Sequence, residues 1–155
     1  LKWAHSKKCD ITYIETMPLG EIDVDRTDQF LPLSKVKETL SKEYTLKSSK
    51  YYTGGPSRYF SVQETGHRVG FITPLTHNFC ELCNRVRLTC TGKLYMCLGQ
   101  EDSADFTQAA RSENWKIELK NAITEAISRK PKGHDFVIRR KHSPSVNRHM
   151  SVTGG

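Results

Sequence analysis

Short apolar runs in the first half of the chain predict strands. Residues 10–17, DITYIETM, are typical of a buried strand, and the residues 18–20 that follow form a turn-like exit. Residues 58–62 and 68–73 also have strand character, and the polar residues 64–67 between them predict a hairpin. Because a lone strand cannot form a domain, residues 10–17 are expected to be the last strand of a sheet whose other strands precede this chain.

Helical spacing of apolar side chains occurs in two further segments. Residues 32–43 and 114–129 carry apolar residues at intervals of three and four, which predicts amphipathic helices. Pro131 and Gly133 are expected to stop the second helix. The apolar faces consist of Leu33, Val36 and Leu40 in the first helix, and of Trp115, Leu119, Ala122, Ile123, Ala126 and Ile127 in the second.

A second hairpin is predicted between the two helices. Residues 85–90 and 93–98 flank the turn-forming pair Thr91–Gly92. Further upstream, the sequence YYTGGP at residues 51–56 breaks the pattern. This break is expected to open a second unit of the chain.

Composition and charge exclude some classes of protein and suggest a partner. The chain has 155 residues, of which 36% are hydrophobic and 26% charged, so it is typical of a globular protein. It contains no apolar run of the ~18 residues that a membrane span needs. Most of the net charge of +7 lies in residues 129–155, where seven basic residues accompany the single acid Asp135. A basic segment predicts a nucleic acid, a nucleotide or an acidic surface of the same protein as its partner, with a solvated tail as the alternative.

The cysteines carry the strongest chemical signal. The five cysteines are Cys9, Cys80, Cys83, Cys90 and Cys97. Four of them are close in sequence and nothing signals secretion, so a metal site in a reducing compartment is favoured over disulfides. The C-x2-C turn brings two sulfurs to one side, and the second hairpin returns Cys97 to the same end. Thiolates suit both zinc and iron–sulfur clusters. Cys9 stands apart and is expected to be an ordinary thiol.

The role of Cys90 decides between these metals. With it, four thiolates would close a structural zinc site; without it, three thiolates would leave one iron of a four-iron cluster open. Strand alternation places Cys90 with Val86 and Leu88, as expected for a buried free thiol, and places Arg85 and Arg87 on the opposite face. Two adjacent guanidiniums repel unless an anion lies between them, so this pair predicts a phosphate or purine ligand. Solvated surface arginines are the alternative.

Residues 70–99, GFITPLTHNFCELCNRVRLTCTGKLYMCLG, closely resemble the molybdenum cofactor biosynthesis protein A family. These are the GTP 3',8-cyclases, which are radical S-adenosylmethionine enzymes. Residues 13–20, YIETMPLG, are similar to the last barrel strand of that family, and residues 150–155, MSVTGG, to its double-glycine end. The most specific pattern is F-C-x2-C-N-R-x-R with a third cysteine after thirteen intervening residues. The resemblance covers nearly the whole chain and corresponds to the C-terminal half of the family.

The resemblance implies a set of functional residues and partners. These are Cys80, Cys83 and Cys97 for an auxiliary 4Fe-4S cluster, Arg85, Val86 and Arg87 for GTP, Met17 for S-adenosylmethionine, and Gly154 and Gly155 for a tail that supports catalysis. One iron of the cluster would be free to bind the purine of GTP. The implied enzyme is a lyase that rearranges GTP to 3',8-cyclo-7,8-dihydro-GTP, and a cyclic pyranopterin monophosphate synthase uses the product. A homodimer and a location in the bacterial cytoplasm or the mitochondrial matrix are further expectations.

The implied fold is α/β with two parts. Residues 1–50 would be the last strand and helix of a partial (βα) barrel. Residues 51–155 would form an α+β iron–sulfur cluster domain with antiparallel hairpins, a C-terminal helix and a tail. The N-terminal C-x3-C-x2-C motif of the family, which holds the cluster that reduces S-adenosylmethionine, has no counterpart in this sequence. A chain that begins at Leu1 without that motif is expected to be a fragment that lacks most of the barrel and is inactive alone.

Two other functions are alternatives to this one. A zinc-ribbon nucleic-acid module would use Cys80, Cys83, Cys90 and Cys97, with the basic tail on phosphates. The tail lacks interleaved aromatic residues, however, and the cysteine spacing is unusual for a ribbon. A ubiquitin-like carrier activated at Gly155 is disfavoured by the cysteine cluster and by the low apolar content of the tail. The family resemblance implies neither a nucleic acid nor a membrane as partner.

Overall fold

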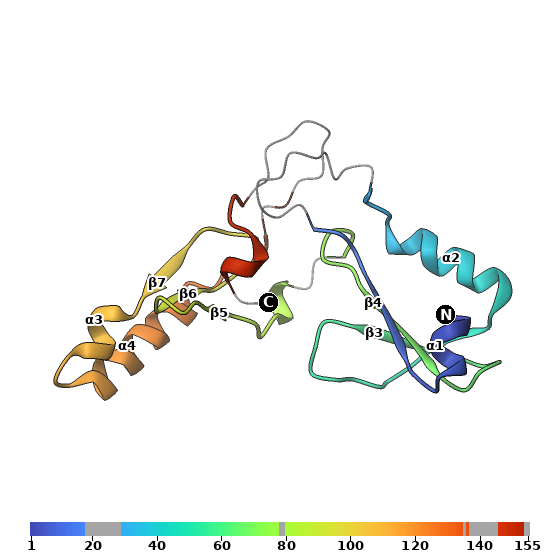
Figure 1. Cartoon of the computed structure of the whole chain (residues 1–155), viewed down its shortest axis with the longest axis horizontal. Helices are drawn as coiled ribbons and strands as arrows, with labels where there is room; N and C mark the ends of the chain where they lie inside the picture. The colour runs from blue at the N-terminus through green and yellow to red at the C-terminus, as the bar shows by residue number, and fades with distance from the viewer. Residues whose placement is uncertain (18–28, 78–79, 135, 137–145, 154–155) are drawn as a thin grey trace. The chain divides into compact units, whose positions relative to one another are not determined.

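The chain divides into two compact units. The computed structural model describes residues 1–17, 29–77, 80–134, 136 and 146–153 (Figure 1). Among these, the first unit contains residues 1–17 and 29–77, and the second contains the residues from Cys80 onward. The division thus falls after Phe79, whereas the sequence pattern places it after Lys50. Within the described residues, no helix is long and apolar enough to cross a membrane.

The first unit is built on a four-stranded mixed sheet. Its strands are β1 (Ile11–Ile14), β2 (Leu46–Ser48), β3 (Arg58–Val62) and β4 (Arg68–Ile72), in the order β1-β4-β3-β2. β3 and β4 form the predicted antiparallel hairpin, and Gly66 supplies the positive φ of +72° that its turn requires. β1 pairs with β4 in parallel, Ile11 lying opposite Val69. The predicted hairpin is confirmed, and its pairing with β1 joins residues 58–72 to the first unit.

A small core lies between this sheet and the first of the two predicted helices. α2 (Leu33–Glu43) buries Leu33 against Val62, Val69 and Phe71. Val36 and Leu40 from the same helix face pack on that cluster, so the predicted helix and its apolar face are confirmed. A short helix that the periodicity did not predict, α1 (Lys2–Ser6), begins the unit.

The predicted strand at residues 10–17 is shorter and less buried than expected. β1 ends at Ile14, whose side chain is 58% exposed, so the expectation of a buried strand is wrong at that position. The next residue, Glu15, is only 2% exposed. Its backbone amide still donates to the Ile72 carbonyl at 3.1 Å, and its carboxylate accepts hydrogen bonds from the amides of Leu33 and Leu75.

An ion pair joins the start of β1 to the start of β4. Asp10 accepts hydrogen bonds from the Arg68 backbone amide at 2.8 Å and from Arg68 Nε at 2.9 Å. Burial raises the pKa of the Asp10 carboxyl, but these bonds and the nearby positive charge outweigh burial and bring the pKa below its ordinary value of 3.8.

We expect Asp10→Asn to weaken the acid sensitivity of the fold. A carboxyl whose folded-state pKa is lowered contributes stability above its unfolded-state pKa, and this contribution is lost as the pH falls through the folded-state value. Urea unfolding at about pH 5 and about pH 3 should show a larger decline in the free energy of unfolding for the wild type than for Asp10→Asn. The difference should be on the order of 1 kcal/mol, because the pair is partly exposed. The exposed Glu38→Gln serves as control, and equal declines for wild type and Asp10→Asn would contradict the prediction.

The second unit is built on a three-stranded antiparallel sheet. Its strands are β5 (Arg87–Leu88), β6 (Lys93–Tyr95) and β7 (Ser103–Asp105), in that order. β5 and β6 confirm the second predicted hairpin, although both strands are shorter than predicted, and Gly92 in its turn has a φ of +83°. The helices of this unit are α3 (Thr107–Arg111) and α4 (Trp115–Ser128), with 3-10 turns η2 (Cys80–Leu82) and η3 (Met150–Val152). The long predicted helix is therefore confirmed as α4.

Only part of the apolar face of α4 is covered. Ala126 is buried in a cluster with Leu94, Met96 and Phe106, and Leu119 and Ala122 pack against it. The other predicted members of the face, Trp115, Ile123 and Ile127, are exposed. The expectation of one buried face is wrong for these three, because the strands of the sheet have only two or three residues each and cover a narrow part of the helix.

The two sheets make the protein a mixed α/β fold. The first unit combines one parallel and two antiparallel strand pairings, and the second is purely antiparallel. In the described residues β1 lies at the edge of its sheet, next to β4.

Candidate metal centre

The C-x2-C motif forms one tight turn. Cys80 begins η2, and the backbone amide of Cys83 donates a hydrogen bond to the Cys80 carbonyl at 3.1 Å. This i to i+3 bond closes a single 3-10 turn, in which side chains three positions apart lie on one side. Both cysteines are half-buried. The local sequence therefore arranges this half of the site.

Cys97 arrives from the second hairpin. In the antiparallel register Arg87 pairs with Tyr95, so residues before Arg87 and after Tyr95 lie at the same end of the hairpin. Cys97 follows that end by two residues and is half-buried. The hairpin thus returns the third cysteine to the segment that begins with the C-x2-C turn, as the spacing predicts.

The pKa of the Cys80 thiol responds to the other two cysteines. Burial, followed by the neighbouring Cys97 and Cys83, raises this pKa to about 11, although the Lys130 ammonium opposes the rise. Among the described residues, no group of three His, Cys, Asp or Glu side chains has the geometry of a metal site. The three thiols are therefore gathered without being closed around an ion.

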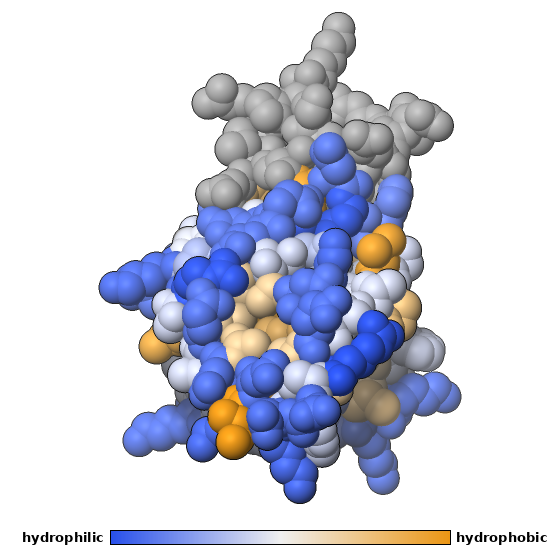
Figure 2. Space-filling view, turned by 90° about the vertical axis from the view of Figure 1, so that its left-hand side faces the viewer, coloured by the Kyte–Doolittle hydropathy of each residue, from blue (hydrophilic) through white to orange (hydrophobic). Residues whose placement is uncertain are grey.

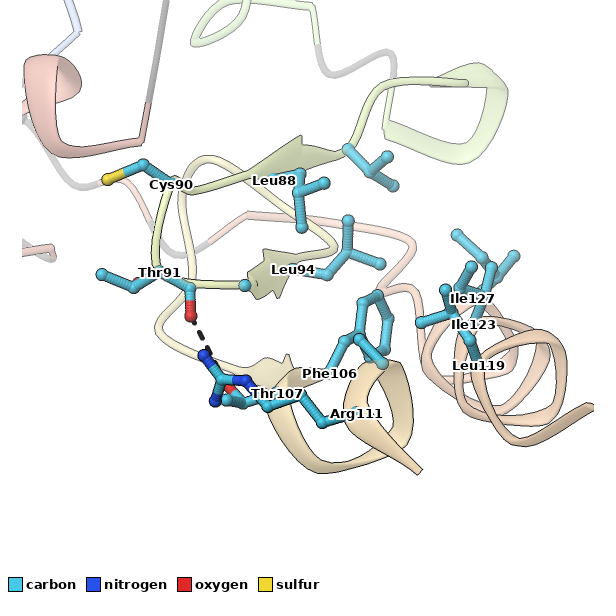
Figure 3. Close-up of a pocket in the computed structure, with 13 residues that line it drawn as sticks. Leu88, Cys90, Thr91, Leu94, Phe106, Thr107, Arg111, Leu119, Ile123 and Ile127 are labelled. Atoms are coloured by element: carbon cyan, nitrogen blue, oxygen red, sulfur yellow. Dashed lines mark hydrogen bonds between the residues drawn. The ribbon is translucent and has the colours of Figure 1, made fainter. Parts of the chain in front are cut away.

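Cys90 lies away from this group. Together with Val86 and Leu88 it lines an apolar groove of about 640 Å³ between β5 and α4, whose opposite wall contains Leu119, Ile123 and Ile127 (Figure 3). All three residues line the groove, but β5 contains only Arg87 and Leu88, and Cys90 lies in the turn beyond them, with its sulfur pointing away from α4 (Figure 3). The expectation of a buried thiol is wrong, however, because Cys90 is exposed: the groove that it lines is open to solvent.

The groove lies in a surface of mixed polarity. Figure 2 shows an apolar area framed by hydrophilic side chains on the side of the molecule that carries α3 and α4. Four exposed large apolar residues line the groove: Val86, Leu88, Ile123 and Ile127.

Arg85, Val86 and Arg87 follow the C-x2-C turn directly. Arg87 is half-buried at the start of β5, and Arg85 and Val86 are exposed. Val86 lines the groove, and the alternation seen in the sequence predicts that the two arginine side chains point to the opposite face. The Arg85 carbonyl accepts a hydrogen bond from Lys130 Nζ at 2.7 Å, so the backbone at this position is held in place.

Two basic side chains from the end of the chain brace the cysteine segments. Lys130 also donates to the Met96 carbonyl. Arg148 Nη2 donates to the carbonyls of Cys97, Leu98 and Gln100 at 3.2, 3.0 and 2.6 Å. Part of the basic segment thus binds backbone oxygens of its own unit. The sequence shows an excess of positive charge in residues 129–155. It contains no local signal that identifies Lys130 and Arg148 as the residues that bind these carbonyls.

The remaining predicted residues fall elsewhere. Met17 lies in the first unit, three residues beyond the end of β1, and is half-buried. Gly154 and Gly155 lie outside the described residues.

Glu15 has a structural role that the sequence pattern did not predict. Its carboxylate accepts hydrogen bonds from the amides of Leu33, Leu75 and Thr76 at 3.3, 3.0 and 3.1 Å, and from the Thr76 hydroxyl at 2.6 Å. It thereby connects the end of β1 to the start of α2 and to the loop that follows β4. The available signal in the sequence was a single glutamate within the apolar run of residues 10–17.

Comparison with known proteins shows the family of this chain. Residues 9–136 match the family described as Molybdenum Cofactor Synthesis C. The chain is 63% identical to the GTP 3',8-cyclases of Brucella ovis and Brucella canis, and 62% identical to that of Brucella abortus strain S19. Each alignment covers all of this chain and 45% of the relative, so the chain spans about half the length of these relatives. The resemblance found in the sequence is confirmed: this chain belongs to the Molybdenum Cofactor Synthesis C family.

Proposed function

We propose that this chain is the C-terminal part of a GTP 3',8-cyclase, the enzyme that rearranges GTP to 3',8-cyclo-7,8-dihydro-GTP in molybdenum cofactor biosynthesis. The observation that carries the proposal is the gathering of the Cys80, Cys83 and Cys97 thiols beside two arginines, in a chain whose similar relatives bear that name. The activity is proposed for a longer protein, since the relatives are about twice as long and the C-x3-C-x2-C motif is not in this chain.

The donor set fits an iron–sulfur cluster. Three half-buried thiols gather at one end of the second hairpin, and thiolates are the usual ligands of a 4Fe-4S cluster. The position of Cys90 in the apolar groove favours three thiolates over the four of a zinc ribbon. When bound through three thiolates, such a cluster supplies an iron with an open coordination position for a donor atom of the substrate.

Arg85 and Arg87 are proposed to hold GTP next to that position. Each guanidinium can donate two parallel hydrogen bonds to a phosphate or to acceptor atoms of a purine. Val86 between them lines the groove, which supports placing the two arginine side chains on the opposite face. Two arginines on one strand face therefore orient an anionic substrate, and orientation is what a selective radical reaction needs.

Other assignments extend the proposal to the complete enzyme. Residues 1–50 would be the end of a partial barrel, and the edge position of β1 supports this, since further strands could pair there. Residues 51–155 would carry the cluster and the GTP contacts. Met17 would contact S-adenosylmethionine, and Gly154 and Gly155 would support catalysis. The complete enzyme would hold a second 4Fe-4S cluster, act in the cytoplasm, form a homodimer and pass its product to a cyclic pyranopterin monophosphate synthase.

We expect replacement of both Arg85 and Arg87 by alanine to weaken GTP binding strongly. Each charge-assisted hydrogen bond lost should cost about 1.5–3 kcal/mol, which is roughly tenfold or more in affinity. The measurement is anaerobic calorimetry of GTP with the iron-reconstituted chain, together with the change that GTP causes in its electron paramagnetic resonance spectrum.

Arg111→Ala is the matched control. Arg111 is an exposed arginine of the same unit. It lines the apolar groove and is not one of the two arginines proposed to bind GTP. The control should bind GTP as the wild type does. Equal affinity in wild type and the Arg85/Arg87 double variant would rule out the proposed GTP contacts.

A further inference from the structure

Lys130 connects the two segments that carry the cysteines. Its ammonium donates to the Arg85 carbonyl at 2.7 Å and to the Met96 carbonyl. Arg85 follows Cys83 by two residues, and Met96 directly precedes Cys97. One side chain from the end of α4 thus spans both halves of the three-cysteine group.

The place where Lys130 binds is the end of the strand ladder. β5 and β6 pair at Leu88 with Leu94 and at Arg87 with Tyr95, and the ladder goes no further toward the cysteines. Beyond that pair, no backbone hydrogen bond joins the described residues of one segment to those of the other, so side chains must hold the two segments together. The Lys130 ammonium has three N–H donors. It can therefore replace the missing ladder by donating to one carbonyl of each segment.

The buried Met96 side chain holds in place the backbone carbonyl that Lys130 binds. Met96 is fully buried in the core of the second unit, so its carbonyl has a fixed location. Lys130 is half-buried, whereas the next lysine, Lys132, is exposed. A lysine that leaves solvent to bind two carbonyls loses side-chain freedom, and only specific contacts compensate for that loss.

Arg148 holds the Cys97 segment from a second direction. Besides its bonds to three carbonyls, its guanidinium lies 4.1 Å from the centre of the Tyr95 ring and forms an ion pair with Glu101 at 2.6 Å. Its side chain is 9% exposed. Within the described part of the chain, the backbone carbonyls that Arg148 binds are those of Cys97, Leu98 and Gln100, so it holds the shape of that loop, whereas Lys130 also reaches the Arg85 segment.

We propose that Lys130 is a positioning residue of the three-cysteine site, which keeps the Cys80–Cys83 turn and Cys97 within reach of one cluster. The inference rests on the proposed function. Thiolate ligands also make the bound cluster anionic, and a nearby ammonium stabilises an anion. Lys130 acts through the backbone of the cysteine segments, by way of the Arg85 and Met96 carbonyls.

The first test measures thiol proximity without any metal. In the metal-free chain, a short bis-maleimide reagent should join Cys97 to Cys80 or Cys83, and peptide mass spectrometry identifies the linked pair. We expect Lys130→Met to lower the yield of that link several-fold, while Lys130→Arg, which keeps the charge and the donors, restores it. Lys132→Met removes an exposed lysine two residues away and should cross-link as the wild type does.

The second test measures cluster retention. After anaerobic reconstitution, Lys130→Met should lose iron to a chelator several-fold faster than the wild type and Lys132→Met, with an unchanged circular dichroism spectrum. If Lys130→Met fails to fold, Lys130→Gln, which keeps an amide donor without the charge, is expected to be intermediate in both tests. Equal cross-linking and equal iron retention in wild type and Lys130→Met would overturn the inference. A wild type that cross-links but binds no iron would instead contradict the proposed function, and the cross-linking comparison would still decide the role of Lys130.

Discussion

Serine at Cys80, Cys83 or Cys97 is expected to abolish iron binding by the chain. A serine hydroxyl is not ionised near neutral pH and is a poor ligand for iron, so each substitution leaves two thiolates. A cluster held by two thiolates exposes two irons to water and is lost. Iron and sulfide analysis after anaerobic reconstitution, with the visible absorbance of the product, measures the effect for each variant.

The two remaining cysteines provide matched controls. Cys90→Ser and Cys9→Ser change exposed thiols, one in the apolar groove and one in the first unit, and both variants should retain iron and sulfide at the wild-type level. Loss of iron from Cys90→Ser as complete as from Cys83→Ser would contradict the assignment of three ligands. A colourless protein that binds zinc and needs all four clustered cysteines would favour the zinc-ribbon alternative.

The second large effect is expected at Glu15. Glu15→Ala removes the acceptor of three backbone amides and one hydroxyl, and the Leu33 amide among them is buried. A buried donor left without a partner costs about 1–3 kcal/mol, and the partly buried donors can regain water, so we expect a loss of about 3 kcal/mol in the free energy of unfolding. Glu15→Gln should be intermediate, since its amide nitrogen would face hydrogen-bond donors.

Urea unfolding and hydrogen exchange test this role separately. Exchange of the Leu75 and Thr76 amides should accelerate in Glu15→Ala, because these amides bind the carboxylate directly. Glu38→Ala, which removes an exposed acid from α2, should change the free energy of unfolding by less than about 0.5 kcal/mol. A Glu15→Ala protein as stable as Glu38→Ala would show that the carboxylate contributes nothing to the first unit.

The apolar groove shows where sequence periodicity reaches its limit. The spacing in α4 correctly predicts a helix, but it does not reveal how much of the apolar face a neighbour covers. The sheet beside α4 has strands of two or three residues, so Ile123 and Ile127 stay exposed and Cys90 shares their groove. Burial depends on the partner element, which the helix sequence does not encode.

The sequence by itself determined the hairpins, both long helices, the C-x2-C turn and the family, because each of these depends on residues close together in the chain. The tertiary structure decided which distant residues support them. Glu15 reaches Leu75 and Thr76, Lys130 reaches Arg85 and Met96, and Arg148 reaches the Cys97 loop. A hydrogen bond from a side chain to a remote carbonyl or amide leaves no periodic pattern in the sequence, since the backbone partner is the same for every residue type. Only the folded chain shows which acid or lysine has such a partner.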